Sequence, residues 1–432
     1  MHKTTTTTGW RAAVAGAVTA ALFPACVDGG KGADCDESVP GSVALTVSAP
    51  DGVPSPTVAL YSEAGERVGL LTAGQSLTDL PGGRYIAELL RSEGGVGALD
   101  FGVQEICVGG SDDEIVVEAF PQPAAGQLWA TSWEAVHVFP PALDATTAAP
   151  AASLTIPFTN SFGGIAVDAT GALWAAAAPT YGARIVALPA GALTGTAEVP
   201  PALELSAPSL AGDANFTSLS FDGDGNLWAT TAPLLGGFVG VVGWSAATLR
   251  EARLLGGLVE QEPTWAATVS GLSALNGGWV DAAGDLWATS ADDEALVRVS
   301  ADALRAATGG VAAAPALEPA ARVRLVDADG NPFRGVESIA PGAEGQLYVL
   351  AAVSGAILSV PTSGVSSGGD LAVDALQLGV TALPTSLATD GTGGVWWSDT
   401  AELGHVSAAG GDGVRIEAPA IERAGVLLLD LP

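Results

Sequence analysis

The sequence Asp222-Gly-Asp-Gly-Asn-Leu-Trp-Ala-Thr230 contains a short motif that occurs six times in the chain. The copies are Gly126-Gln-Leu-Trp129, Gly171-Ala-Leu-Trp174, Gly225-Asn-Leu-Trp228, Gly284-Asp-Leu-Trp287, Gly345-Gln-Leu-Tyr348 and Gly393-Gly-Val-Trp396. Their aromatic residues stand 45 to 61 positions apart. This spacing is typical of four-stranded blades in a β-propeller, so the repeat predicts six blades.

The second copy shows how one blade is built. Ile165-Ala-Val-Asp168 predicts an inner strand, Leu173-Trp-Ala-Ala176 a second, Arg184-Ile-Val-Ala-Leu188 a third and Ala202-Leu-Glu-Leu205 the outer strand. Four repeats carry an aspartate six residues before the aromatic residue: Asp168, Asp222, Asp281 and Asp390. We expect each carboxylate to accept backbone N–H groups of the turn and each tryptophan to pack between neighbouring blades.

The two ends of this region complement each other. Residues 121–125, Pro-Gln-Pro-Ala-Ala, cannot form an inner strand ahead of Trp129, whereas the chain ends in the apolar sequence Val426-Leu-Leu-Leu-Asp-Leu-Pro432. A propeller has to close or leave exposed strand edges. We therefore expect residues 124–432 to form a six-bladed propeller in which the last strand becomes the innermost strand of the first blade.

Residues 42–120 predict a separate β-sandwich. Val43-Ala-Leu-Thr-Val-Ser48, Val58-Ala-Leu-Tyr61, Arg84-Tyr-Ile-Ala-Glu-Leu-Leu90 and Ile115-Val-Val-Glu-Ala-Phe120 read as short strands. The segment Leu77-Thr-Asp-Leu-Pro-Gly-Gly-Arg-Tyr85 resembles a turn and strand of carboxypeptidase-regulatory-like and other immunoglobulin-like modules, which implies an inward tyrosine. The expected fold class is all-β, an N-terminal β-sandwich followed by the six-bladed propeller.

The amino terminus predicts export. His2, Lys3 and Arg11 precede an uncharged stretch, residues 12–23, that is too short to span a membrane. The sequence Leu22-Phe-Pro-Ala-Cys26 resembles a bacterial lipobox, which implies a signal peptide over residues 1–25, acylation of Cys26 and a tether over residues 26–41. An ordinary secretory signal cut nearby is the alternative.

Cysteine count and charge narrow the function further. If Cys26 carries lipid, Cys35 and Cys107 remain as an even pair that we expect to form a disulfide in an oxidising compartment. Removing Lys3 and Arg11 with the signal leaves 14 of the 16 basic residues against 47 acidic ones. Such an acidic chain argues against nucleic acid as a partner.

The repeats Asp222-Gly-Asp-Gly-Asn-Leu-Trp228 and Asp390-Gly-Thr-Gly-Gly-Val-Trp396 resemble those of six-bladed propellers of the NHL, SMP-30/gluconolactonase and streptogramin-lyase group. That resemblance implies a site at the mouth of the central channel, built from residues just before each inner strand. The corresponding positions here hold Gly163, Gly164, Thr217, Ser218, Asn276, Gly277, Glu337, Ser338, Thr385 and Ser386. Most are small, so close packing of the inner strands is the simplest interpretation.

Asn276 and Glu337 are the exceptions, and Asp399 at the end of a second strand could join them. These oxygen ligands suit a hard divalent cation such as calcium, and they resemble the metal site of the SMP-30 lactonases. The first-blade Glu-Gly-Pro motif of those enzymes is missing before Trp129. Calcium could also bind the acidic loops at Asp222 and Asp327, although tight turns explain both loops equally well.

A lyase mechanism of the streptogramin type needs channel histidines. The mature chain has His137 and His405 only. Both fall in predicted third strands, where we expect them to face solvent, so lyase chemistry is poorly supported.

The sequence therefore predicts a monomeric, lipid-anchored protein of the cell envelope, at the outer membrane or in the periplasm. Its expected role is non-catalytic binding or scaffolding, with a protein or carbohydrate partner. The alternatives are a metal-dependent lactonase using Glu337, Asn276 and Asp399, and a propeller with a purely structural role.

Overall fold

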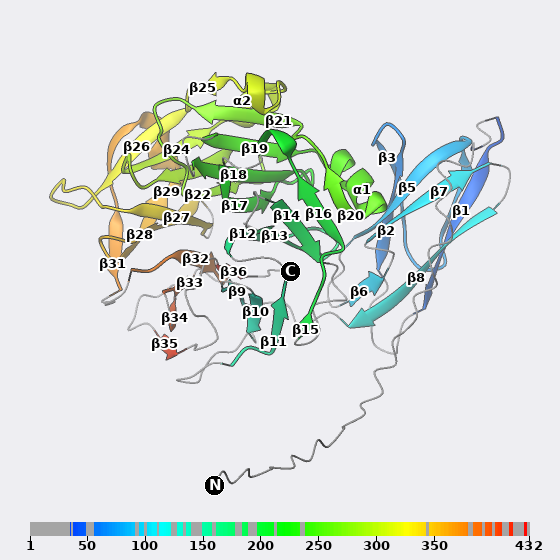
Figure 1. Cartoon of the computed structure of the whole chain (residues 1–432), viewed down its shortest axis with the longest axis horizontal. Helices are drawn as coiled ribbons and strands as arrows, with labels where there is room; N and C mark the ends of the chain where they lie inside the picture. The colour runs from blue at the N-terminus through cyan, green and yellow to red at the C-terminus, as the bar shows by residue number, and fades with distance from the viewer. Residues whose placement is uncertain are drawn as a thin grey trace, which may run out of the picture.

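The computed structural model describes residues 35, 38–48, 56–90, 95–98, 102–109, 112–121, 128–132, 135–139, 149–157, 161–177, 184–188, 197–210, 214–233, 238–342, 345–378, 383–390, 394–399, 402–407, 414–417 and 427–429. The predicted signal peptide, Cys26 and most of the tether lie outside these residues. Within them the chain is all-β, as predicted, and forms two domains side by side (Figure 1).

The N-terminal domain is a sandwich of two four-stranded sheets. One sheet has the order β4 (Ser76–Leu80), β1 (Gly41–Ser48), β8 (Asp112–Pro121) and β6 (Gly95–Ala98). The other has the order β3 (Arg67–Leu71), β2 (Thr57–Ser62), β5 (Gly83–Leu90) and β7 (Val103–Val108). Alternate residues of both sheets, such as Val43, Leu60 and Ile115, form one buried core. Burial of this apolar surface is what holds the two sheets together.

Two details of the sandwich match the sequence prediction. A disulfide joins Cys35 to Cys107, whose Cα atoms lie 5.3 Å apart. Tyr85 is buried, and its hydroxyl donates a hydrogen bond of 2.8 Å to the carbonyl oxygen of Pro81. The Pro-Gly turn thus leads into a strand with an inward tyrosine, as expected.

The second domain is a propeller of six sheets. From the inner edge outward, blade one holds β36 (Leu427–Leu429), β9 (Leu128–Thr131), β10 (Ala135–Phe139), β11 (Ala152–Thr155) and β15 (Ala197–Glu198). Blade two holds β12 (Phe162–Val167), β13 (Leu173–Ala177), β14 (Arg184–Leu188), β16 (Leu203–Ser206) and β20 (Gly257–Glu260). Blade three holds β17 (Ala214–Phe221), β18 (Leu227–Pro233), β19 (Gly240–Trp244), β21 (Trp265–Val269) and β25 (Ala316–Leu317).

The remaining blades follow the same order. Blade four holds β22 (Gly277–Val280), β23 (Leu286–Ser290), β24 (Ala295–Val299), β26 (Ala321–Val326) and β30 (Gly369–Ala372). Blade five holds β27 (Val336–Pro341), β28 (Gln346–Ala351), β29 (Ala356–Pro361) and β31 (Asp374–Gln377). Blade six holds β32 (Ser386–Thr389), β33 (Val395–Ser398), β34 (Glu402–Val406) and β35 (Val414–Glu417). Helices α1 (Ala246–Leu255) and α2 (Ala301–Ala306) follow the third strands of blades three and four.

The ring closes as the sequence predicts. Strand β36, from the end of the chain, pairs antiparallel with β9 and so supplies the inner strand that the first repeat lacks. Neighbouring blades are also joined at the outer edge of blades one to four. There β15, β20, β25 and β30 form the fifth strand of each sheet. Each belongs in sequence to the following blade and pairs in parallel with the fourth strand of the preceding one, β11, β16, β21 and β26 respectively; in blade one, β36 supplies the first strand.

The repeated aspartate and tryptophan act together. In blade two, Asp168 Oδ1 accepts the backbone N–H groups of Thr170 and Ala172, while Oδ2 accepts Trp174 Nε1–H at 2.8 Å. The Asp222–Trp228 and Asp281–Trp287 pairs repeat the indole bond, each at 3.0 Å. Each aspartate therefore fixes both the turn and the orientation of the indole.

These indoles fill the spaces between blades, as expected. Trp174 makes an edge contact of 5.9 Å, between ring centroids, with Phe221 of blade three. Trp228 likewise belongs to a buried cluster with Leu275 and Val280 of blade four. Every blade thus depends on its neighbour for part of its core.

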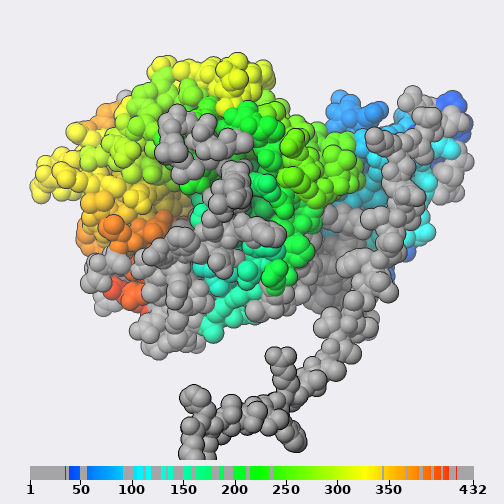
Figure 2. Space-filling model, in the orientation of Figure 1, coloured from blue at the N-terminus to red at the C-terminus, as the bar shows by residue number. Residues whose placement is uncertain are grey.

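The sandwich lies against the outer edge of blades two and three (Figure 1). Helix α1 carries the contact: Arg250 and Arg253 pair with Glu88 of the sandwich, and Glu251 accepts two bonds of 2.8 and 3.0 Å from Arg84. The space-filling view shows the two domains in contact along this helix (Figure 2).

Candidate functional site

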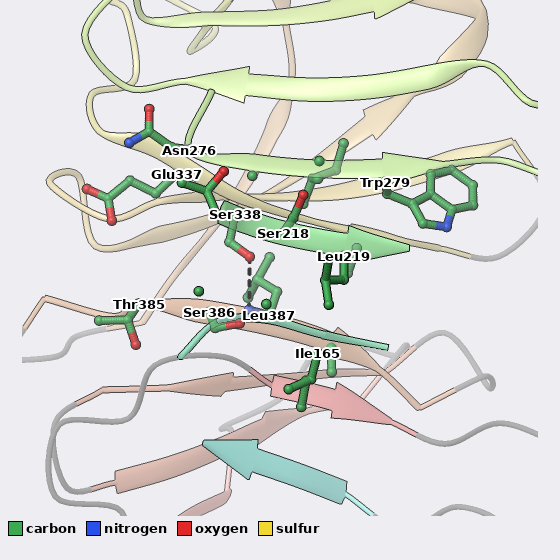
Figure 3. A pocket seen from close by; sticks show the side chains of 18 of the residues that line it. Ile165, Ser218, Leu219, Asn276, Trp279, Glu337, Ser338, Thr385, Ser386 and Leu387 are labelled. Atoms are coloured by element: carbon green, nitrogen blue, oxygen red, sulfur yellow. Dashed lines mark hydrogen bonds between the residues drawn. The ribbon is translucent and has the colours of Figure 1, made fainter. Parts of the chain in front are cut away.

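The inner strands enclose a cavity of about 320 Å³ on the axis of the ring. Its walls are β12, β17, β22, β27 and β32, and Figure 3 shows side chains from these strands converging on it. Thr385, Glu337 and Asn276 all lie toward the end where the inner strands begin (Figure 3). This is the channel mouth at which the family resemblance places a site.

Small residues bring the inner strands close, as the sequence predicts. A Cβ atom on Gly163 would lie 1.6 Å from the carbonyl oxygen of Phe216, and one on Gly164 would lie 2.6 Å from the amide nitrogen of Leu219. One on Gly277 would lie 2.5 Å from the carbonyl oxygen of Glu337. No side chain fits at these distances, so glycine is required for blades two and four to meet their neighbours.

Hydroxyl groups of the inner strands and of β23 then link neighbouring blades. Thr217 Oγ1 donates to the carbonyl oxygen of Leu275 at 2.6 Å, and Thr289 Oγ1 donates to that of Glu337 at 2.9 Å. Ser338 Oγ accepts the N–H of Leu387 at 3.3 Å, the bond drawn in Figure 3. Each of these hydroxyls satisfies a backbone group of the next blade, which leaves it poorly placed to act as a nucleophile.

Glu337 is the acidic side chain of the channel wall. It is half-buried, and this burial raises the pKa of its carboxyl group because a low-dielectric wall disfavours the charged form. Asn276 lies beside it, but its Oδ1 accepts the N–H of Ala291 at 2.9 Å. Its carbonyl oxygen is therefore already engaged in holding a loop.

The structure does not place Asp399 with these two residues. Asp399 does not line the cavity, because it directly follows β33, the strand next outward from the channel, and it is buried there. There its Oδ1 accepts the N–H of Glu402 at 2.9 Å. Within the described part of the chain, His, Cys, Asp and Glu side chains nowhere form a group of three or more that could hold a metal ion.

The expectation that both histidines face solvent is wrong. His137 is buried, with Nδ1 2.9 Å from Ser153 Oγ and Nε2 3.0 Å from Ser132 Oγ. His405 Nε2 lies 2.8 Å from Asp390 Oδ2, and its ring packs on Trp396. The prediction failed because a third strand is not solvent-facing here: His137 is buried and the side chain of His405 is only 23% exposed. Neither histidine lines the channel.

The two acidic loops use their oxygens for turn formation. Asp222 accepts backbone N–H groups through Oδ1 and the Nε1–H of Trp228 through Oδ2. Asp327 Oδ1 accepts the N–H groups of Asp329 and Asn331. These bonds explain both loops as turns without a cation.

The sequence pattern did not single out every polar or aromatic residue of the channel wall. Asn215, at the start of β17, and Trp279, near the end of β22, also line it. Trp279 lies in an inner strand, two residues before Asp281. Because side chains alternate along a strand, its position in the repeat could have indicated that it faces the channel.

Comparison with known proteins supports the fold. No family model matches the chain, and no curated sequence matches it either. A chain in the crystal structure of a nidogen/laminin complex is 12% identical, over 71% of this chain and 99% of that one, with a TM-score of 0.50. A catalytically inactive virginiamycin B lyase from Staphylococcus aureus, with quinupristin, is 14% identical over 61% of this chain and 72% of that one (TM-score 0.38).

A protein of unknown function from Bacteroides caccae is 9% identical, over 71% of this chain and 98% of that one (TM-score 0.40). At 12% identity, the nidogen/laminin match shows the fold alone. The described residues include no helix long and apolar enough to cross a membrane.

Proposed function

We propose that this protein is an exported, lipid-anchored component of the cell envelope whose propeller is a non-catalytic binding module. The partner meets the channel mouth at the starts of the inner strands. The partner is a protein or, as the alternative, a carbohydrate.

One observation carries the proposal. Glu337 is the one ionisable side chain among the described residues that line the channel. Acid–base catalysis needs a second group of suitable pKa, and a metal site needs further ligands. Asn276 has its carbonyl oxygen engaged and Asp399 lies one strand away, so the channel offers recognition groups without a catalytic set.

Photo-crosslinking tests the binding role. A photoreactive residue at Thr385 lies on the channel wall, and one at the exposed Leu255 lies at the end of α1 and serves as the matched control. Crosslinking in intact cells should join an envelope protein to the Thr385 variant only. Equal labelling at both positions, or none at either, would reject a protein partner at this mouth. Binding to an envelope glycan array would then identify the carbohydrate alternative.

The lactonase alternative makes the opposite prediction. A metal-dependent hydrolase should purify with about one bound metal ion per chain, which Glu337→Ala should remove together with lactone hydrolysis. A binding module should hydrolyse no lactone, with or without chelator. Its metal content should be the same in the parent and in Glu337→Ala.

Export is supported by the Cys35–Cys107 disulfide, since disulfides persist in oxidising compartments. Lipid anchoring rests on the sequence around Cys26. We expect Cys26→Ser to lose palmitate labelling and to move from the membrane to the soluble fraction. An unchanged distribution would favour an ordinary secretory signal.

A further inference from the structure

A second cavity lies between the two domains, well apart from the channel. It has a volume of about 700 Å³. The sandwich contributes Tyr61, Arg67 and Glu88 to its wall, and the propeller contributes residues of blades two and three together with α1. Pockets for small molecules occur preferentially at domain interfaces.

The key residue is Arg253 of α1. Its side chain is 5% exposed and pairs with Glu88 through Nη2, while Nη1 lies 3.5 Å from Asp168 Oδ2, an ion-pair distance. Neither Nε nor Nη1 has a hydrogen-bond partner within the described structure. Unsatisfied buried donors are rare, and in a charged group they are especially costly. They indicate that an oxygen atom from outside the chain completes the cluster.

The charges around the cavity indicate which class of ligand can supply that oxygen atom. Glu88, Asp168, Asp222 and Asp224 line the cavity against Arg67, Arg250 and Arg253, so carboxylates outnumber guanidinium groups. An anion would meet this excess of negative charge. A neutral hydroxyl group instead accepts from the arginine and donates to a neighbouring carboxylate.

The rest of the wall suits the same ligand. Tyr61, Trp174 and Phe221 add aromatic surface, and Arg250 lies over the Tyr61 ring, 3.7 Å from its centroid. Many fixed polar groups beside aromatic surface suit a small ligand that carries several hydroxyl groups. We propose that this interdomain cavity binds a neutral carbohydrate, a mono- or disaccharide, whose hydroxyl groups accept hydrogen bonds from Arg253.

Three variants test the proposal by calorimetric titration of the mature protein with neutral monosaccharides, N-acetylglucosamine and their disaccharides. Ala169→Phe adds bulk to the cavity wall without removing a charge. Ala282→Phe makes the same change at the equivalent turn position of blade four, outside the cavity, and is the matched control. Arg253→Lys keeps the charge that Glu88 needs but removes the Nε–H donor.

We expect at least one sugar of the panel to bind the parent and Ala282→Phe with equal affinity. Ala169→Phe should abolish binding with an unchanged melting temperature, and Arg253→Lys should weaken it by about tenfold or more, the usual loss for a hydrogen bond to a charged group. No binding by the parent would mean that water alone fills the cavity, which overturns the proposal.

Two other results also contradict it. Binding that persists in Ala169→Phe would place the sugar elsewhere. Binding of acetate or inorganic phosphate in place of every sugar would show an anion site. Crosslinking at Thr385 reports on the channel independently, so either proposal can fail without the other.

Discussion

In blades two, three, four and six, a single aspartate carboxylate organises the turn that leads from the inner strand to the second strand. Asp222 accepts two backbone N–H groups through Oδ1 and the indole of Trp228 through Oδ2, and it is buried. The turn bonds could be predicted, because aspartate favours such local bonds. The indole bond could not, since a spacing of six residues does not reveal which way a side chain points.

Replacing this carboxylate should be costly. We expect Asp222→Ala to lower the free energy of unfolding by about 1–3 kcal/mol, because buried donors of the turn and of Trp228 lose their acceptor. Asp224→Ala is the control in the same loop: its side chain is 70% exposed and paired with Arg305. That pair should contribute less than about 1 kcal/mol. Urea denaturation of both variants measures the difference, and equal losses would contradict the role of Asp222.

His137 should make stability depend on pH. Burial lowers the pKa of its imidazole below the ordinary value of 6.5. The unfolded chain therefore binds a proton before the folded one does, so stability should fall as the pH drops from about 6.5 towards the folded pKa. In His137→Gln this contribution is absent. Denaturation between pH 8 and 5 should show the parent losing stability relative to the variant, and a constant difference would refute the assignment.

The inner strands show what a repeat can predict at the level of an element. The column of small residues at their starts predicts close packing, and Gly163, Gly164 and Gly277 confirm it. The column predicts less about chemistry. Asp399 lies at the same end of the strands as Glu337, but it follows the second strand of its blade and does not line the channel. The order of strands in the sequence does not show how far a residue lies from the channel.

The helices were also missed, although their signals are present. Ser245 and Ser300 follow third strands, and each accepts a backbone N–H three residues on as an N-cap. Asn226 and Asp285, at matching positions of the repeat, accept the N–H groups of Ala246 and Ala301. Residues of the same turn therefore also bind the first N–H group of the helix beside it. The strand pattern of the repeat gave no sign of these helices.

Close packing of the inner strands can be tested by adding one methyl group. We expect Gly164→Ala to cost about 1–3 kcal/mol, because its Cβ would press on the backbone of β17, which has to shift. Gly223→Ala is the control, since its Cβ would have its nearest neighbour at 3.3 Å. That change should stay within about 1 kcal/mol of the parent. Thermal denaturation compares the two, and a neutral Gly164→Ala would mean that the strands are farther apart than described.

At the scale of the whole molecule, the closure of the ring could be predicted and the docking of the sandwich could not. The first repeat lacks an inner strand and the chain ends with an additional apolar strand. Pairing of the two can therefore be predicted from the sequence. Glu88 and Arg253 stand 165 residues apart, and no repeat or pattern relates them. Contacts of that kind depend on the relative position of two finished domains.

Closure predicts how the ring should unfold. Deleting residues 424–432 removes β36 and leaves the backbone of β9 without its inner partner. Because each blade completes the core of the next, the loss should not stay local. We expect the propeller to melt cooperatively at a lower temperature, with tryptophan fluorescence and the circular dichroism of the strands changing in a single transition.

A transplanted strand provides the control. Inserting residues 424–432 and a short turn between residues 121 and 128 of the truncated chain would return an antiparallel partner to β9 from within blade one. If closure depends on that pairing, this variant should recover the melting temperature of the parent. A truncated protein that melts like the parent would show that the ring holds without its last strand, whereas a transplant that fails to restore stability would show that joining the two ends of the chain is itself required.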